Sequence, residues 1–262
     1  MSDLRVDLRT KDGIRLAGLL RETRSETPVG SVVLAHGITV EKNEGGFYRT
    51  LAGMLSDAGF HSIRVDFRGH GESDGRPEEM TISGERLDLA ETVDFLTARF
   101  HLPIGIVGTS FGAGVSVLYA AEAARSIRAL ALLSPVLDYE KTFLRPSTEW
   151  TRRWFNQSAI RLWEEGTPLN LEGFPLGCKL LAEFRTMKPG DRLLQLGIPT
   201  LIIHGDEDSM VPFEVADFYA RKLKSGKFVA VKGADHGLAG FETKVFTEVV
   251  KWLARYVPEL PS

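Results

Sequence analysis

Short apolar runs alternate with longer amphipathic stretches along most of the chain. The apolar runs predict strands over Ser31–Ala35, Ser62–Phe67, Ile104–Gly108, Ala129–Leu133, Thr200–Ile203 and Lys227–Val231. Several of them, such as residues 32–35 and 201–203, do not alternate with polar residues. That pattern is typical of strands that are covered on both faces, as they are in parallel sheets. The sequence therefore predicts a buried, mostly parallel sheet.

Between the predicted strands, apolar residues recur at helical spacing. This spacing predicts helices over Phe47–Asp57, Glu85–Phe100, Ala113–Ala124, Glu214–Lys224 and Phe241–Tyr256. Near the N-terminus, Arg5–Thr10 and Ile14–Arg21 flank Lys11-Asp12-Gly13, which favours a hairpin turn because glycine tolerates a positive φ. Strands and helices in this order argue for a doubly wound α/β sheet with right-handed crossovers, preceded by an antiparallel hairpin.

An insert of residues 137–196 interrupts the alternation, so we expect a core of residues 1–136 and 197–262. The insert is rich in aromatic residues: Phe143, Trp150, Trp154, Phe155, Trp163, Phe174 and Phe184. These rings either form a small core of the insert's own or belong to a lid over a substrate pocket. Trp150 and Trp154 are four positions apart and share a helix face, so they are the candidate pocket-lining residues.

Composition and charge narrow the class of protein. The chain of 262 residues has 32 basic and 35 acidic residues and a net charge of −3, which gives no electrostatic footprint for nucleic acid or anionic lipid. The single cysteine, Cys178, excludes an internal disulfide, and no Cys/His cluster has zinc spacing. The first ten residues lack the apolar region of a signal peptide, and no apolar run is long enough to span a bilayer. We expect a cytoplasmic protein without a metal.

The segment Gly108-Thr109-Ser110-Phe111-Gly112 carries the clearest chemical signal. It directly follows a predicted strand and opens a predicted helix, which is the structural context that a G-x-S-x-G motif requires. The serine of this motif sits on a tight, strained turn, and the flanking glycines let neighbouring backbones approach. The turn exposes the hydroxyl at the carboxyl edge of the sheet, where the helix dipole favours negative charge. The sequence therefore predicts Ser110 as a nucleophile.

A serine nucleophile needs a neighbouring base and a carboxylate that orients that base. Of the six histidines, only His236 lies in a glycine-flanked loop between the last predicted strand and the last helix, so we expect it to be the base. Asp208 follows the strand Thr200–Ile203 and is the preferred carboxylate. Asp206, in the same loop, and Asp138, after the preceding strand, remain alternatives. The chain order Ser, Asp, His matches that of α/β hydrolases.

Several motifs in one order make the chain resemble the α/β-hydrolase-fold serine esterases over nearly its whole length. They are His36-Gly37-Ile38, Asp66-Phe67-Arg68-Gly69-His70-Gly71-Glu72-Ser73, Gly108–Gly112, Gly205-x-x-Asp208-x-x-Val211 and Asp235-His236. Within that family it is most similar to bacterial feruloyl/cinnamoyl-type esterases. The resemblance implies that the backbone amides of Ile38 and Phe111 form an oxyanion hole, that His36 shapes a loop, and that no cofactor is needed. Thr109 and Ala113 depart from the residues that the family often has there.

These features predict a serine hydrolase that cleaves small-molecule carboxylic esters with short-to-medium or aromatic acyl groups. A thioesterase for acyl-CoA or an acyl carrier is the alternative, and it requires a cationic surface such as Arg145, Arg152, Arg153 and Arg161 in the insert would supply. The third hypothesis is a protein that keeps the α/β-hydrolase fold and binds a ligand without catalysing a reaction. Enzymes of this kind often form dimers, so the sequence leaves open whether this protein forms a homodimer.

Overall fold

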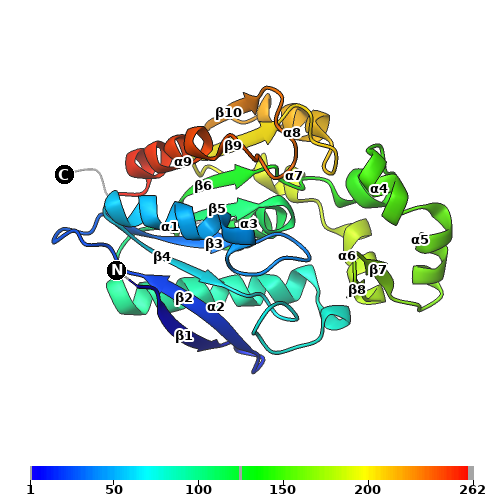
Figure 1. The fold of residues 1–262 in the computed structure, drawn as a ribbon, viewed down its shortest axis with the longest axis horizontal. Coiled ribbons are helices and arrows are strands. Elements are labelled where there is room, and N and C mark those ends of the chain that lie inside the picture. The colour runs from blue at the N-terminus through cyan, green and yellow to red at the C-terminus, as the bar shows by residue number, and fades with distance from the viewer. Residues whose placement is uncertain (1, 124–125, 259–262) are drawn as a thin grey trace.

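The computed structural model describes residues 2–123 and 126–258, and its centre is an eight-stranded sheet (Figure 1). The strands are β1 (Leu4–Arg9), β2 (Arg15–Arg21), β3 (Gly30–Ala35), β4 (Phe60–Val65), β5 (Ile104–Thr109), β6 (Ile127–Leu133), β9 (Thr200–Gly205) and β10 (Gly226–Val231). Their order is β1-β2-β4-β3-β5-β6-β9-β10. From β4 to β10 all neighbours pair in parallel, whereas β2 pairs antiparallel with β1 and β4. The predicted parallel sheet with an N-terminal hairpin is confirmed.

Helices cover both faces of this sheet. They are α1 (Phe47–Asp57), α2 (Ile82–Phe100), α3 (Ser110–Glu122), α8 (Phe213–Ala220) and α9 (Glu242–Tyr256). Along β3, Val32 and Leu34 belong to the apolar cluster that contains α1 and α9, whereas Val33 and Ala35 belong to the cluster that contains α2, α3 and α8. This double coverage explains why the strand sequences do not alternate. Ala124, the expected last residue of the third helix, lies outside the described residues.

The insert packs at one end of the sheet, on the right of Figure 1. Its elements are the π-helix η3 (Glu140–Leu144), α4 (Glu149–Trp154), α5 (Gln157–Glu164), α6 (Cys178–Thr186), α7 (Pro189–Leu193) and a hairpin of β7 (Leu169–Leu171) and β8 (Phe174–Leu176). Five aromatic residues of the insert are almost fully buried: Tyr139, Phe143, Phe155, Trp163 and Phe184. Most of the insert's rings therefore belong to the hydrophobic core that also contains α2 and α3, not to a separate core of the insert's own.

The parallel strands end at one edge of the sheet, and the loops that follow them converge there. The loop after β3 leads through a short 3-10 helix, η1 (Glu44–Gly46), into α1, and the loop after β4 contains a second one, η2 (Pro77–Glu79). The loops after β5, β9 and β10 carry the motifs that the sequence singles out. None of the helices in the described ranges is long and apolar enough to cross a membrane.

Candidate active site

Ser110 is the first residue of α3, and its backbone has a left-handed φ of +52°. A Cβ on Gly108 would lie 2.6 Å from the Cα of Ala113, and a Cβ on Gly112 would lie 2.2 Å from the carbonyl oxygen of His36. Both distances are far too short for a side chain, so each glycine is required by a close backbone approach. The turn therefore has the strained geometry that the G-x-S-x-G spacing predicts.

The structure brings Ser110, His236 and Asp208 together from three distant parts of the chain. His236 Nε2 lies 3.0 Å from Ser110 Oγ, and His236 Nδ1 lies 2.8 Å from Asp208 Oδ2. Both contacts are normal hydrogen-bond distances. Because ionised Asp208 can only accept, Nδ1 carries a proton and Nε2 is free to take one from the serine. This arrangement suits a nucleophile, a base and an orienting carboxylate.

Asp208 is held as an anion by hydrogen bonds to both of its oxygens. Oδ1 accepts from the backbone amides of Met210 at 2.9 Å and Val211 at 2.7 Å, and Oδ2 also lies 2.9 Å from His204 Nε2. Burial alone would raise the pKa of Asp208, but the contacts with His204 and His236 outweigh it and hold the pKa well below its usual value. The carboxylate therefore stays charged throughout the neutral range.

The loops that carry Asp208 and His236 are tied to each other by Asp235. Its Oδ1 accepts from the backbone amides of Ser209 and His236, each at 2.8 Å. Ser134, at the end of β6, donates its hydroxyl to the carbonyl oxygen of His236 at 2.9 Å. Three loops at the sheet edge thus fix the position of the imidazole.

The two alternative carboxylates have other contacts. Asp206 Oδ1 accepts from the amide of Gly233 at 2.6 Å, and Asp138 Oδ1 accepts from the amide of Lys141 at 3.0 Å. Asp206 thus links the loop after β9 to the loop after β10, and Asp138 stabilises a local turn. The structure therefore selects Asp208 from the three candidates as the partner of His236.

The structure gives the surroundings of the backbone amides of Phe111 and Ile38, which the resemblance implies as oxyanion donors. Phe111 is the second residue of α3, so its amide has no acceptor within the helix. His36 Nε2 accepts from the Phe67 amide at 2.9 Å, which leaves the proton on Nδ1 to be donated to the Gly37 carbonyl at 2.8 Å. Because the Gly37 carbonyl faces His36 in the core, the Ile38 amide of the same trans peptide points the opposite way.

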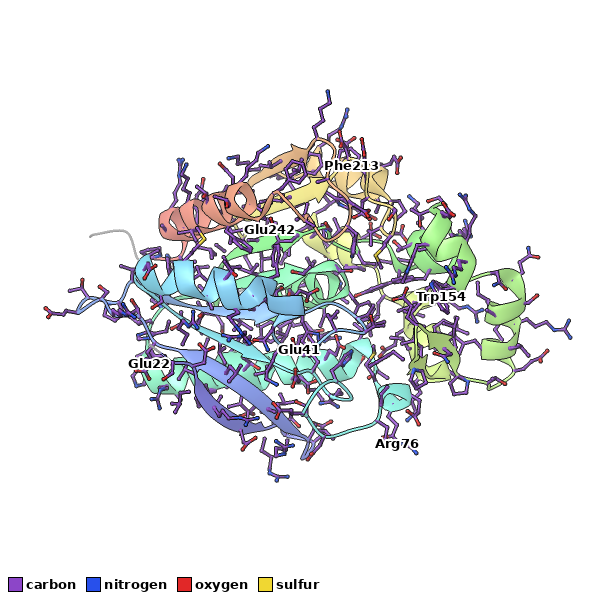
Figure 2. The ribbon with its side chains drawn as sticks, viewed as in Figure 1. Glu22, Glu41, Arg76, Trp154, Phe213 and Glu242 are labelled. Carbon is purple, nitrogen blue, oxygen red and sulfur yellow. The ribbon has the colours of Figure 1, made fainter. Side chains whose placement is uncertain are left out.

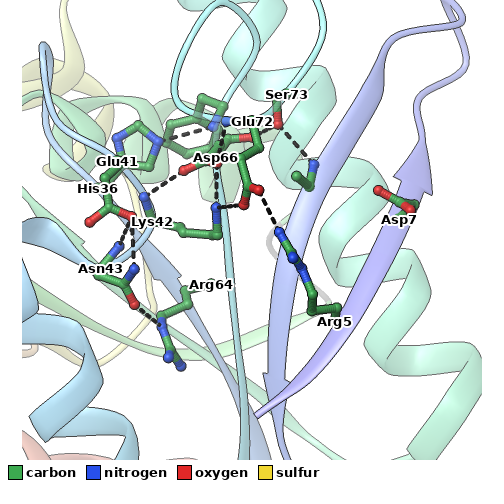
Figure 3. A network of polar contacts seen from close by, with 12 residues as sticks. Arg5, Asp7, His36, Glu41, Lys42, Asn43, Arg64, Asp66, Glu72 and Ser73 are labelled. Atoms are coloured by element: carbon green, nitrogen blue, oxygen red, sulfur yellow. Dashed lines mark hydrogen bonds and ion pairs between the residues drawn. The ribbon is translucent and has the colours of Figure 1, made fainter.

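A buried ion pair anchors the loop after β3 to the loop after β4 (Figure 3). Lys42 Nζ lies 2.6 Å from Asp66 Oδ2 and 2.8 Å from Glu72 Oε2, and the Lys42 amide donates to Asp66 Oδ1 at 2.7 Å. Asp66 is fully buried, and Arg5 pairs with the outer side of Glu72. The residues Asp66–Ser73 thus support the site structurally.

Two cavities adjoin the triad. The first has a volume of about 250 Å³ and lies between the sheet edge and the insert; its lining includes Ile38, Glu44, Ser110, Phe143, Trp150 and His236. The second has a volume of about 630 Å³ and lies where α1 meets α9; its lining includes Glu44, Phe47, Thr109, His236, Glu242 and Phe246. His236 and Glu44 border both cavities, so the imidazole faces two hollows.

The expectation that both tryptophans of α4 line the pocket needs correction. Trp150 borders the smaller cavity together with Phe143, but Trp154 does not belong to its lining. Trp154, labelled in Figure 2, packs against the main hydrophobic core. The Arg153 guanidinium lies 5.3 Å from the centre of its ring. Trp150 is the second residue of this six-residue helix and Trp154 is its last.

Backbone strain is concentrated around these cavities. Seven non-glycine residues in the described ranges have a positive φ: Thr39, Glu44, His101, Ser110, Ser134, Glu172 and Leu238. Five of the seven line one or both cavities, and a sixth, Ser134, bonds the loop of His236. A left-handed backbone at a non-glycine residue is uncommon and collects at functional sites. The distribution of strain therefore supports the location of the site.

Glu44 is a member of the site that the sequence did not reveal. Its Oε2 accepts from the Gly37 amide at 2.8 Å, and burial raises the pKa of Glu44 to about 7 against the opposing effects of that amide and of His236. The neighbouring pair Gly45-Gly46 signals a turn. Nothing in the spacing marks this carboxylate among the other acidic residues.

The arginines of the insert that could bind an acyl carrier, and Cys178, lie apart from Ser110, His236 and Asp208. Arg145 pairs with Glu140, and Arg161 pairs with Glu165, both on exposed surfaces of the insert. Cys178 is exposed, with its Sγ 3.2 Å from the Trp163 carbonyl oxygen. In residues 2–123 and 126–258, no group of three His, Cys, Asp or Glu side chains could hold a metal ion.

A comparison with protein families decides the assignment. The family described as serine aminopeptidase S33, a hydrolase family, matches residues 26–172, which is more than half of the chain. The chain belongs to this family. Human protein ABHD12B is 29% identical over 195 residues, 73% of this chain and 48% of its own. The monoacylglycerol lipase of Mycolicibacterium smegmatis is 30% identical over 118 residues, 44% of this chain and 41% of its own. The chain thus spans about half or less of the length of these curated relatives.

Solved structures confirm the α/β-hydrolase fold. Est1E from Butyrivibrio proteoclasticus with ferulic acid bound superposes with a TM-score of 0.76 at 23% identity, covering 95% of this chain and 97% of that one. An esterase from Pyrococcus furiosus gives a TM-score of 0.75 at 21% identity, covering 97% and 91%. At this level of identity the likeness establishes the fold, which agrees with the resemblance seen in the sequence.

Proposed function

We propose that this member of the family is a serine hydrolase that cleaves carboxylic esters through an acyl-enzyme. The observation that carries the proposal is the hydrogen-bonded series from Ser110 Oγ through the imidazole of His236 to Asp208, at 3.0 and 2.8 Å, on the wall of a cavity. The esterases and lipases among the similar proteins support the same reaction class.

In the first half of the reaction, Ser110 Oγ attacks the acyl carbon while His236 Nε2 takes its proton. The carbonyl oxygen becomes negatively charged and accepts hydrogen bonds from the amides of Ile38 and Phe111. The imidazolium of His236 is stabilised by Asp208 and donates the proton to the departing alcohol. The acyl group remains bound to Ser110.

In the second half, water attacks the acyl-enzyme. His236 takes a proton from the water, the same two amides stabilise the second tetrahedral oxyanion, and His236 then returns the proton to Ser110 Oγ. The products are a carboxylic acid and the regenerated enzyme. Every step uses side chains and amides of this chain.

The smaller cavity favours a short-to-medium or aromatic acyl group. Its volume of about 250 Å³ lies below the roughly 300–1,000 Å³ that drug-sized ligands occupy. Its lining is mostly apolar and includes Ile38, Val40, Phe143, Trp150 and Met210. Such a space accepts a compact apolar group and is too small for a long alkyl chain.

The charges around the site favour an oxyester over an acyl-CoA thioester. The described residues that line the two cavities include the carboxylates of Glu44, Glu172 and Glu242 but no lysine or arginine. Arg145 borders a separate surface hollow, and its guanidinium is paired with Glu140. A carrier with phosphate groups would meet negative charge at the site, which opposes its binding.

The direct test is a hydrolysis panel of p-nitrophenyl esters from acetyl to palmitoyl, with methyl ferulate and an acyl-CoA, run on the wild type, Ser110→Ala and Ser83→Ala. Ser83 is an exposed serine in the first turn of α2, which makes it a matched control. We expect activity on short or aromatic esters and a loss of at least about three decades in Ser110→Ala only. Retention of most of the activity in Ser110→Ala would overturn the mechanism.

A fluorophosphonate probe separates catalysis from mere ligand binding. An activated serine reacts covalently with such a probe, so the wild type and Ser83→Ala are expected to be labelled and Ser110→Ala is not. A wild type that neither reacts with the probe nor turns over any ester of the panel would instead support a protein that binds ligands without catalysis.

A further inference from the structure

Glu44 lies beside the triad but has no part in the reaction described above. Its Oε2 accepts from the Gly37 amide at 2.8 Å. The point where a Cβ on Gly37 would stand is 3.4 Å from Glu44 Oε1 and 3.3 Å from Ser110 Cβ, so the carboxyl and the nucleophile lie on the same side of Gly37. Glu44 Oε1 and Ser110 Cβ are therefore no farther apart than the sum of these two distances. Glu44 also borders both cavities together with His236.

The backbone at Glu44 would suit a different residue better. Glu44 has a φ of +49°, and Gly45 and Gly46 follow with φ values of +62° and +99°. Glycine or asparagine adopts this conformation more readily than glutamate does. Hydrogen bonds from the Glu44 amide to the Glu41 carbonyl and from the Gly46 amide to the Asn43 carbonyl, both 2.8 Å, hold the turn in place. A strained glutamate in a well-anchored turn indicates that its carboxylate is used.

Glu44 and His236 influence each other's charge. Burial lowers the pKa of His236, but Asp208, Glu44 and Asp235 outweigh it, so the pKa of His236 is raised. His236 in turn opposes the rise that burial causes in the pKa of Glu44. The other titratable groups near Glu44 are Glu41 on its own loop, Tyr48 on α1, and Glu242 at the start of α9 on the wall of the same cavity. With a pKa of about 7, Glu44 carries its full negative charge only above neutral pH, and this charge lies near the place where the imidazolium forms.

We propose that Glu44 is a positioning residue of the catalytic centre. One oxygen holds the Gly37 amide and so fixes the peptide before the one that carries the Ile38 amide. The negative charge of its carboxylate stabilises the imidazolium of His236 while Ser110 is deprotonated. The proposal rests on the hydrolase mechanism above and adds a second carboxylate to the one that Asp208 supplies.

The charge is tested by Glu44→Gln, which keeps an oxygen that can accept from the Gly37 amide and removes the negative charge. We expect kcat to fall about tenfold with little change in KM, because the imidazolium forms only as the transition state is reached. We also expect the acid limb of kcat/KM to move to lower pH by less than about one unit. Losing a nearby anion lowers the pKa of His236, but Glu44, with a pKa of about 7, is only partly ionised where that limb falls. A pH profile of kcat/KM that coincides with that of the wild type would overturn the electrostatic part of the proposal.

The hydrogen bond is tested by Glu44→Gly, which suits the positive φ but removes the whole side chain. We expect the melting temperature to stay within a few degrees of the wild type, because relief of the backbone strain offsets the removal of the hydrogen bond to Gly37. We expect kcat to fall about a hundredfold, because a small displacement of the Gly37–Ile38 segment misplaces the oxyanion donor. A glycine variant with wild-type kcat would show that the carboxylate has no role in positioning.

Glu248→Gln is the matched control, because it removes a carboxylate of α9 that pairs with Lys227 and lines neither cavity. Its acid limb is expected to coincide with that of the wild type. Ser110→Ala, measured in parallel, separates the two proposals: if it is inactive and Glu44→Gln has a wild-type pH profile, the inference about Glu44 fails alone. If Ser110→Ala stays active, the proposed function itself fails.

Discussion

The edge of the sheet and the insert are held together in different ways. At the sheet edge, the triad is fixed by backbone hydrogen bonds, by the Asp235 contacts and by the buried pair of Lys42 and Asp66. In the insert, aromatic rings pack against one another, and ion pairs such as that of Arg161 with Glu165 are exposed. The contrast shows that directional polar contacts hold Ser110, His236 and Asp208, whereas packing between apolar side chains holds most of the insert. Substitutions should therefore affect rate in one region and selectivity in the other.

The largest effect is expected from Asp208→Asn, which keeps the shape of the carboxylate but removes its charge. The amide cannot hold both His204 and His236 as donors, so His236 loses the tautomer that leaves Nε2 free to accept. A loss of about four decades in kcat is expected, with the fold retained. Steady-state kinetics and circular dichroism provide the measurement.

Asp206→Asn is the matched control in the same loop. Its carboxylate accepts from the Gly233 amide and does not contact the imidazole, so activity is expected to remain within a few fold of the wild type. A comparable loss in the two variants would mean that the loop as a whole, rather than the carboxylate of residue 208, determines the rate.

The next effect concerns stability and compares one ion pair from each region. Lys42→Met leaves Asp66 buried without its cation, since the side chains of the pair are 7% and 0% exposed. We expect a loss of about 3–5 kcal/mol in the free energy of unfolding. The side chains of Arg161 and Glu165 are 79% and 53% exposed, so Arg161→Met is expected to cost no more than about 0.5 kcal/mol.

Urea unfolding of both variants measures the difference, with the slope of the transition as a check on two-state behaviour. Equal midpoints for the two variants would contradict the distinction drawn between the sheet edge and the insert. Lys42→Met should also lose activity, because Lys42 anchors the loop that carries Ile38.

The sheet and the triad were predictable because they depend on patterns that are local in the sequence. Apolar runs mark the strands, and the glycines around Ser110 are required by contacts with Ala113 and with the His36 carbonyl that any such turn makes. The order of motifs then determines which edge of the sheet they share. The sequence already preferred Asp208 over Asp206, and the loop geometry, with His236 Nδ1 2.8 Å from Asp208 Oδ2, agrees with that preference.

Glu44 and Trp154 show what the sequence does not contain. The position of Glu44 depends on three consecutive residues with positive φ, and only the two glycines among them are visible as a turn signal. Trp150 and Trp154 are four positions apart on one helix, yet only Trp150 lines the cavity. The surroundings of a six-residue helix are determined by tertiary packing, which its own sequence does not show. Long-range packing cannot be derived from periodicity.

A smaller effect is expected at the pocket wall. Trp150→Ala enlarges the smaller cavity, so kcat/KM for acetyl and aromatic esters is expected to fall roughly tenfold while longer acyl chains gain relative to them. Trp154→Ala, four residues away, should lower the melting temperature without changing the chain-length preference. The ester panel measures both, and an identical shift in preference would show that the two rings act as one wall.

The smallest effect is expected where the core meets the insert, at Glu85 of α2. Both of its carboxyl oxygens are buried without a hydrogen-bond partner among the described residues, and burial, with Asp88 and Glu183 nearby, raises the pKa of Glu85 well above its ordinary value. A raised pKa means that the stabilising contribution of the protonated group is complete below about pH 4.5 and is lost as pH rises through the folded-state value.

Glu85→Gln cannot ionise, so its stability should fall less steeply than that of the wild type between pH 5 and pH 8. At pH 5 the two proteins should differ by less than about 1 kcal/mol, because the neutral acid and the amide have similar shapes. Melting temperatures at pH 5, 6.5 and 8 provide the test, and contributions from other groups cancel in the difference. If the melting temperatures of the two proteins change in parallel with pH, Glu85 keeps one protonation state in this range. The contact between core and insert would then be insensitive to pH.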